Sequence, residues 1–343
     1  MSDNLRRYRA IRNALTPAYP TAPTGNFARH LQTLATKVPD GTKPESRVKR
    51  FARWIDNERI LEAMYFLPYA DLLLRHCALQ TVVLVMDGSV VGRGCNALMI
   101  HVVYQGRALP LAWRVRQGPK GHFPEDLHSA LVELVSALIP AGTQGVWLGD
   151  GECDGTRLQQ TVQDAGWSSV CRTGCHRTAW WDGETFRLDT LRVCSKPGTL
   201  VALSQVGCTR AASGPIMLIG CWAKGWKAPL YLVTNMASAE ETCRLYAKRF
   251  RIEPFFSDQK SRGLHLHKSH LANPQRLARL FIAACLAYIW IVYLGSVCIK
   301  EGWVRIIHRR HRCDLSLFQL GLRLLEYFFN EELPIPVQFH VTI

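Results

Sequence analysis

The chain has 343 residues, of which 48% are hydrophobic, so it can bury one large core or two modest ones and is not an intrinsically disordered chain. Lys and Arg (42) exceed Asp and Glu (27), which gives a formal net charge of +15 and makes a polyanion the expected macromolecular partner. The segment Met1 to Arg12 is polar and basic and does not have the pattern of a secretory signal, so the twelve cysteines are expected to be reduced thiols in a cytoplasm.

Residues 1–78 are predicted to be helical and basic. A first group of arginines lies between Arg6 and Arg12, and in a second group Arg50 and Arg53 alternate with aromatic residues. Basic residues interleaved with aromatic ones on a helix favour phosphate contact on one face and packing on the other, so we expect this region to contact DNA. The alternative is an ordinary solvated helix, because no helix-turn-helix pattern is clear.

The pattern changes at Thr81, where β-branched residues begin. The run Thr81 to Met86 predicts a central strand that ends at Asp87. Two further strands are expected at 97–104 and 108–115, with a tight hairpin turn at 105–107 between them.

A helix and another strand follow. Apolar spacing predicts a helix over 124–138, and Gly145 to Gly149 predicts a strand that leads directly into Asp150. Three antiparallel strands, a helix and a strand in this order are typical of an α/β fold with a ribonuclease-H-like mixed-sheet core. The first and fourth strands are neighbours in that core, so Asp87 and Asp150 would lie side by side. Two such carboxylates repel each other unless a cation lies between them, although a single Asp at a strand end is more often a turn or cap residue.

Residues 171–236 differ from the segments on either side, because they are rich in Gly, Thr, Val and Trp. They predict four short strands, at 185–188, 199–206, 217–222 and 230–234. We interpret the segment as a β-rich insertion between a first part of the core, residues 79–170, and a second part, residues 237–300.

The segment 246–260 carries four polar residues at helical spacing. On a helix that turns by about 100° per residue, one narrow sector holds Tyr246, Arg249, Glu253 and Lys260. A carboxylate flanked by cations can bind a metal ion while its neighbours bind phosphate oxygens; the alternative is a solvated helix with internal ion pairs. Pro254 follows Glu253 directly and is expected to bend the helix there.

The order Tyr, two residues, Arg, three residues, Glu, six residues, Lys resembles the signature of bacterial insertion-sequence transposases of the DDE class, in the subgroup whose type member is insertion sequence four. All four positions match in spacing. The segments 86–89 and 107–111 also resemble the first block of that family. The resemblance runs from about Arg47 to Tyr293 and is sparse before Val82.

This resemblance implies an enzyme that cleaves DNA strands and joins them to a target by a cut-and-paste reaction. Asp87, Asp150 and Glu253 would be its catalytic residues and would bind two Mg²⁺ ions, for which Mn²⁺ would substitute. Glu152 and Asp154 follow Asp150 where the family commonly has an Arg, so either could be a ligand instead.

The resemblance also implies which residues contact DNA. Phosphates of the transposon end would be held by Tyr246, Arg249 and Lys260. A base flipped out of the DNA would stack on an aromatic residue of the insertion. Tyr231 is the best placed by resemblance, and Trp226 and Trp222 are rivals; the alternative for each of them is plain packing in the core.

The C-terminal part of the chain contains the most apolar segment, Leu280 to Val297. It is long enough to cross a bilayer, but its basic flanks and the absence of a second such segment favour a buried central helix. Residues 301–343 are predicted to form a basic and amphipathic helical tail that pairs two subunits or contacts DNA. Cys171 and Cys175 with the histidines at 265–270 could hold zinc, although buried or incidental residues are the favoured interpretation.

The resemblance therefore predicts a bacterial cytoplasmic protein, associated with the nucleoid and not with a membrane. It would act as a homodimer on terminal inverted repeats and on target DNA. The first alternative is a transposase-derived DNA-binding protein that has lost its catalytic activity, and the second is a membrane-anchored protein.

Overall fold

The computed structural model describes residues 43–118, 123–190, 196–208, 213–309 and 313–335. The arginines between Arg6 and Arg12 lie outside these residues, so their contact with DNA stays a prediction.

The N-terminal part of the described chain is helical. In α3 the aromatic residues Phe51 and Trp54 are buried, as is Ile55, whereas Arg53 is exposed and Arg50 is half-buried. One face of this helix therefore packs on the fold, and the other carries basic side chains. The helices of this part are α3 (Pro44–Asp56), α4 (Glu62–Tyr65) and α5 (Leu67–Cys77).

Ten strands of the described residues form one mixed sheet in the order β3-β2-β1-β4-β5-β10-β9-β8-β6-β7. Strands β1, β2 and β3 are antiparallel, whereas β4 runs parallel to β1, and β5 runs parallel to β4. This arrangement is that of a ribonuclease-H-like core and confirms the predicted fold class. Its elements are β1 (Val82–Gly92), β2 (Cys95–Tyr104), β3 (Arg107–Gln117), α6 (Glu125–Ser136), β4 (Gly145–Gly149), α7 (Thr156–Asp164) and β5 (Ser168–Thr173).

Strand β1 is longer than the sequence predicted. Its expected end was Asp87, but β1 continues to Gly92 because residues 87–92 pair with β2. The pairing between β1 and β4 ends earlier, at Val85 and Leu148. Asp87 therefore lies within β1 but beyond the end of β4.

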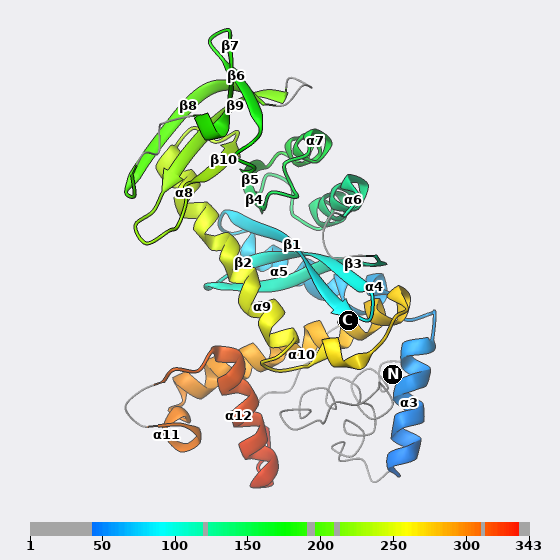
Figure 1. Ribbon diagram of the computed structural model, residues 1–343. Coiled ribbons are helices and arrows are strands. Elements are labelled where there is room, and N and C mark those ends of the chain that lie inside the picture. The colour runs from blue at the N-terminus through cyan, green and yellow to red at the C-terminus, as the bar shows by residue number, and fades with distance from the viewer. Residues whose placement is uncertain (1–42, 119–122, 191–195, 209–212, 310–312, 336–343) are drawn as a thin grey trace.

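The strands predicted between residues 171 and 236 are present, and they extend the same sheet. Strand β10 pairs with β5, and the other four strands continue outward from β10, away from the core (Figure 1). These strands are β6 (Thr178–Trp181), β7 (Glu184–Arg187), β8 (Thr199–Cys208), β9 (Ser213–Trp222) and β10 (Leu230–Thr234), with a short 3₁₀ helix, η1 (Leu188–Thr190), between β7 and β8.

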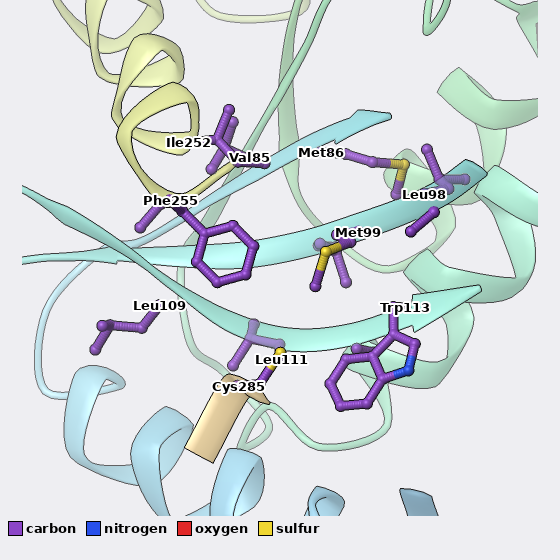
Figure 2. Close-up of a cluster of buried hydrophobic side chains, with 14 of the residues drawn as sticks. Val85, Met86, Leu98, Met99, Leu109, Leu111, Trp113, Ile252, Phe255 and Cys285 are labelled. Atoms are coloured by element: carbon purple, nitrogen blue, oxygen red, sulfur yellow. The ribbon is translucent and has the colours of Figure 1, made fainter. Parts of the chain in front are cut away.

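Helices from the second half of the chain cover the first three strands. Figure 2 shows Leu111 and Trp113 of β3 in one apolar cluster with Phe255 of α9 and Cys285 of α10. Burial of each such side chain stabilises the fold by about 1.5–3 kcal/mol. The helices of this half are α8 (Ala239–Tyr246), η3 (Ala247–Arg251), α9 (Ile252–Gln259), η4 (Leu266–Ser269), α10 (Pro274–Lys300), α11 (Val304–Ile307) and α12 (Leu317–Asn330).

Helix α10 contains the apolar segment that the sequence singled out. Among the described residues it is the one helix long and apolar enough to cross a membrane, and 78% of its most apolar window is buried inside the fold. Helix α12 crosses it closely, because a Cβ atom on Gly321 would collide with the carbonyl oxygen of Ile291. In this structure α10 is a central core helix.

A buried histidine between β2 and α9 makes the stability of this core depend on pH. His101 is fully buried against the rings of Phe255 and Phe256, and neither of its ring nitrogens has a hydrogen-bond partner among the described residues. Burial lowers the pKa of His101 to about 3. The unfolded chain takes up a proton at this residue near pH 6.5 and the folded chain does not, so the folded state loses stability as the pH falls from 6.5 towards 3.

Replacing His101 with Phe should remove this sensitivity. The parent is expected to lose about 2 kcal/mol of unfolding free energy at this site between pH 7 and pH 5, and His101→Phe should not show that part of the loss. Urea unfolding at the two pH values measures the difference. The control is His76→Gln, which removes an exposed histidine; an equal effect of both variants would contradict the assignment to His101.

Candidate active site

Asp87 and Asp150 both lie just beyond the point where the parallel pairing of β1 with β4 ends. The register pairs Val85 with Leu148, and continuing it by two residues brings Asp87 level with Asp150. Asp150 is the first residue after β4 ends at Gly149. The structure therefore brings these two predicted residues together, although they are far apart along the chain.

Local hydrogen bonds hold each carboxylate. Oδ1 of Asp87 accepts a hydrogen bond from the N–H of Gly88 at 2.7 Å, and Oδ1 of Asp150 accepts one from the N–H of Glu152 at 3.0 Å. The carbonyl of Asp150 also accepts a bond from the N–H of Cys153 at 3.0 Å, which closes a tight turn. One oxygen of each carboxylate is thus fixed by the backbone beside it.

The segment that carries Glu253 is not the single regular helix that the spacing predicted. It consists of α8, the 3₁₀ helix η3 and α9, and Lys260 follows α9 with non-helical dihedral angles (φ −100°, ψ −103°). Pro254 explains the break, because in a continuous α-helix its ring would clash with the carbonyl of Phe250. Here it lies in the first turn of α9, where its missing N–H costs no helical hydrogen bond. Arg249 still contacts Tyr246 and Glu253, so only the placement of Lys260 in the same helical sector is wrong.

Arg249 connects Glu253 to Asp87. Its Nη1 lies 3.2 Å from Oδ2 of Asp87, and its Nη2 lies 3.6 Å from Oε1 of Glu253. The guanidinium also lies over the rings of Tyr246 and Phe250, at 5.9 and 4.8 Å from their centroids. Arg249 thus joins Asp87 to Glu253, and we call the three acids Asp87, Asp150 and Glu253 the acidic cluster.

The electrostatics of the acidic cluster show an excess of negative charge. The pKa of Asp87 is raised to about 6: burial is the main cause, Asp150 and Glu253 also raise it, and Arg249 and the hydrogen bond from Gly88 lower it. Asp87 therefore interacts with both of the other acids predicted to be catalytic. Such a group is stabilised by cations, and carboxylate oxygens are the ligands that Mg²⁺ prefers.

The acidic cluster suits a divalent metal in its donor atoms but is not a preformed metal site. Within the described residues, no group of three or more His, Cys, Asp or Glu side chains is close enough to hold an ion, and this applies equally to the zinc ligands considered at Cys171, Cys175 and residues 265–270. Between Asp87 and Glu253 the space is taken by the Arg249 guanidinium. A metal ion shared by these two acids would require that side chain to move.

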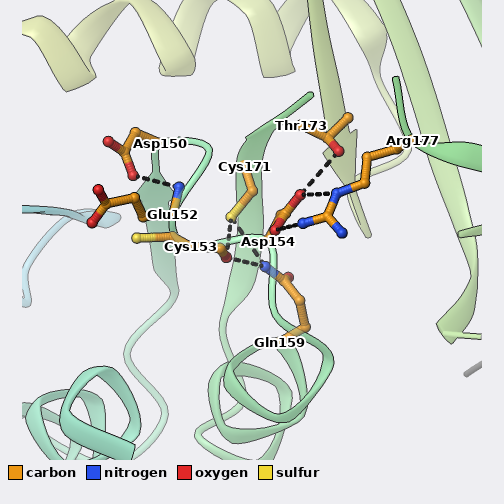
Figure 3. A network of polar contacts seen from close by, with 8 residues as sticks. All are labelled: Asp150, Glu152, Cys153, Asp154, Gln159, Cys171, Thr173 and Arg177. Carbon is orange, nitrogen blue, oxygen red and sulfur yellow. Dashed lines mark hydrogen bonds and ion pairs between the residues drawn. The ribbon is translucent and has the colours of Figure 1, made fainter. Parts of the chain in front are cut away.

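Asp154 is engaged in a different interaction, shown in Figure 3. Its carboxylate accepts hydrogen bonds from Nε and Nη2 of Arg177, at 3.1 and 2.8 Å, and from the hydroxyl of Thr173 at 3.1 Å. These bonds tie the turn after Asp150 to β5 and to the loop before β6. Asp154 is therefore a structural residue here, whereas the exposed Glu152 lies beside Asp150 in the same view.

A second part of this network connects the turn to α7 and β5, and it was not predicted from the sequence. The amide of Gln159 donates to the carbonyl of Cys153 at 3.1 Å, and the thiol of Cys171 donates to the same carbonyl at 3.3 Å. Gln159 and Arg177 lie on separate elements, and neither sequence spacing nor residue type singles them out. Only the folded strand order reveals that they support Asp150.

The predicted DNA-contacting residues differ in their exposure to solvent and in their contacts. Tyr246 is buried beside Arg249, and burial raises its pKa to about 12. Tyr231 is only 6% exposed, so its ring is not available to a flipped base in this conformation, whereas Trp226 is 40% exposed. Lys260 donates from Nζ to the hydroxyl of Ser89 on β1, at 2.6 Å, and so lies near the extension of the strand that carries Asp87.

The family of the chain follows from its sequence. Residues 81–290, more than half of the chain, match the transposase DDE domain family, and the chain belongs to that family. The chain is a transposase by this membership. A comparison with curated proteins finds no match.

Two solved structures are similar to the chain at low sequence identity. One is the piggyBac transposase in a synaptic complex with hairpin DNA, with 13% identity, a TM-score of 0.46 and coverage of 98% of this chain and 74% of that one. The other is human ENDOV, with 14% identity, a TM-score of 0.30 and coverage of 59% of this chain and 98% of that one. Both scores are low, so the strand order described above defines the fold.

The role of Asp154 can be tested by a charge-neutral replacement. Asp154→Asn should lower the unfolding free energy by about 1–3 kcal/mol, because a charged acceptor of three hydrogen bonds is lost while Arg177 remains, and it should leave Mn²⁺ binding intact. Asp126→Asn is the matched control, because Asp126 pairs with Arg157 on the exposed surface and should contribute less than about 1 kcal/mol. Unchanged stability with lost Mn²⁺ binding in Asp154→Asn would instead identify Asp154 as a ligand.

Proposed function

We propose that the chain cleaves DNA at the ends of an insertion sequence and joins the freed ends to target DNA, in a reaction that depends on divalent metal ions. The observation that supports this most directly is the acidic cluster: a shared register sets Asp87 level with Asp150, and Glu253 is connected to Asp87 through Arg249. A DDE transposase needs three such acids, and each comes here from a different element of the core.

In this proposal Asp87, Asp150 and Glu253 hold Mg²⁺, and Mn²⁺ substitutes for it. Bound metal would activate the attacking water or 3′-hydroxyl and neutralise charge on the leaving oxygen. The chain's own cations do the positioning. Arg249 can form two parallel hydrogen bonds with a phosphate, and Lys260 supplies a point charge, so both would orient the scissile strand.

Further contacts with DNA would come from the periphery. The exposed Arg53 and half-buried Arg50 of α3 would contact phosphates, and Trp226, in the loop between β9 and β10, offers an exposed aromatic ring on which a base could stack. Tyr231 could do so only after a rearrangement that exposes it. The net charge of +15 supports DNA as the partner.

The wider organisation is part of the same proposal. The protein would act on two terminal inverted repeats as a homodimer, in the cytoplasm of a bacterium and in association with its nucleoid. The basic N-terminal region, residues 1–78, the outer strands within 171–236 and the tail 301–343 would provide the contacts with DNA and between subunits. The acids of the cluster, with Arg249 beside them, favour an active enzyme over a DNA-binding protein that has lost catalysis.

Cleavage of the element's own ends tests the proposal. With Mg²⁺ and a plasmid that carries the gene with its flanking DNA, the parent should release cut ends, and Glu253→Gln should reduce the rate by at least about a hundredfold because a metal ligand is lost. Gel analysis of the plasmid measures the products.

Glu241→Gln is the control, because Glu241 is a carboxylate on the preceding helix that pairs with Arg244 and not with the acidic cluster. It should cleave like the parent. Equal cleavage by Glu253→Gln and the parent would remove Glu253 from the active site, and binding of the flanking DNA without cleavage by the parent would favour the inactive DNA-binding protein.

A further inference from the structure

The guanidinium of Arg249 lies where a cation shared by Asp87 and Glu253 would lie. It contacts Oδ2 of Asp87 with one terminal nitrogen and Oε1 of Glu253 with the other, at 3.2 and 3.6 Å. The Arg249 side chain is only 11% exposed. Burial of a charged group is costly unless it is paired, so these two carboxylates are what makes this position tolerable for an arginine.

Few other interactions hold the guanidinium in place. Its Nε has no hydrogen-bond partner among the described residues, and the remaining contacts are with the faces of Tyr246 and Phe250. Phe250 is 40% exposed and the Glu253 side chain is 58% exposed, so one wall of the site is open to solvent. The side chain can therefore leave without breaking a backbone hydrogen bond or opening the core.

We propose that Arg249 is a built-in counter-ion, which occupies the acidic cluster in the DNA-free protein and competes with divalent cations for Asp87 and Glu253. This inference rests on the proposed function, because it takes these acids to be metal ligands. A guanidinium and a divalent cation cannot share the same carboxylate oxygens, so one must be displaced for the other to bind.

This competition makes metal binding at the site depend on the presence of DNA. A phosphate is a stronger bidentate partner for a guanidinium than a half-exposed carboxylate, and the proposed reaction brings phosphates to this edge of the sheet. Once Arg249 pairs with a phosphate, Asp87 and Glu253 are free to bind metal. The coupling is reciprocal. A phosphate that pairs with Arg249 raises the affinity of the acids for metal, and bound metal raises the affinity of Arg249 for the phosphate by the same factor.

Mn²⁺ binding to the full chain without DNA tests this. The free Mn²⁺ signal in electron paramagnetic resonance gives the dissociation constant for the parent and for Arg249→Gln, and the variant should bind Mn²⁺ about tenfold more tightly. Arg244→Gln is the matched control: it removes a guanidinium that pairs with Glu241 one helical segment earlier, and it should bind like the parent. If Arg249→Gln does not fold, Arg249→Lys replaces it, because one ammonium cannot contact both carboxylates in the same way.

Asp87→Asn distinguishes a failure of the counter-ion role from a failure of the proposed metal site. If Asp87→Asn weakens Mn²⁺ binding while Arg249→Gln binds like the parent or more weakly, the counter-ion role is overturned and the metal site stands. If Asp87→Asn leaves Mn²⁺ binding unchanged both alone and combined with Arg249→Gln, the proposed metal site itself is wrong. Tighter binding in Arg249→Gln that is lost on adding Asp87→Asn is the result expected here.

Discussion

The parallel pairing of β1 with β4 is the constraint on which the site depends. Its register sets Asp87 level with Asp150, and a shift by one residue would turn one of the two side chains to the opposite face of the sheet. The pairing is maintained by burial: Leu84, Val85, Trp147 and Leu148 are all fully buried. The position of two charged side chains is therefore fixed by the packing of apolar ones.

A second layer of polar contacts holds the Asp150 turn. Because Asp154 bonds to Thr173 and Arg177, the turn cannot move without moving β5 and the loop that leads to the outer strands. Asp154 thus connects the turn that carries Asp150 to β5 and, through Arg177, to the start of β6. On the other side, Phe255 of α9 packs in the main core two residues after Glu253, so the third acid is also carried by a buried element.

Much of this arrangement could be predicted from the sequence. The alternation and β-branched runs located the core strands, and the two-residue turn at Gln105 and Gly106 has the positive φ values that such a hairpin requires. The helix after Pro124 was predicted from its apolar spacing. These features depend on local residue patterns, which is why a sequence can reveal them.

Other features depend on contacts between distant segments and could not be predicted. The end of β1 is set by its partner β2, and the support of Asp150 by Gln159 and Arg177 exists only once the strands are in order. The bend at Pro254 was expected from the sequence, but the contact of Lys260 with Ser89 on β1 joins two segments that are far apart along the chain, and the spacing within residues 246–260 does not reveal it. The burial of Tyr231 agrees with the alternative of core packing, and its cause is the position of β10 within the sheet, beside β5.

The central claim is that Asp87 and Asp150 meet to bind a shared divalent ion. Anomalous diffraction from crystals of the protein soaked in Mn²⁺ tests it most directly. An anomalous peak between these two carboxylates, about 2.0–2.4 Å from an oxygen of each, is the expected result. Mn²⁺ bound only elsewhere, with Asp87 and Asp150 on separate parts of the surface, would contradict it.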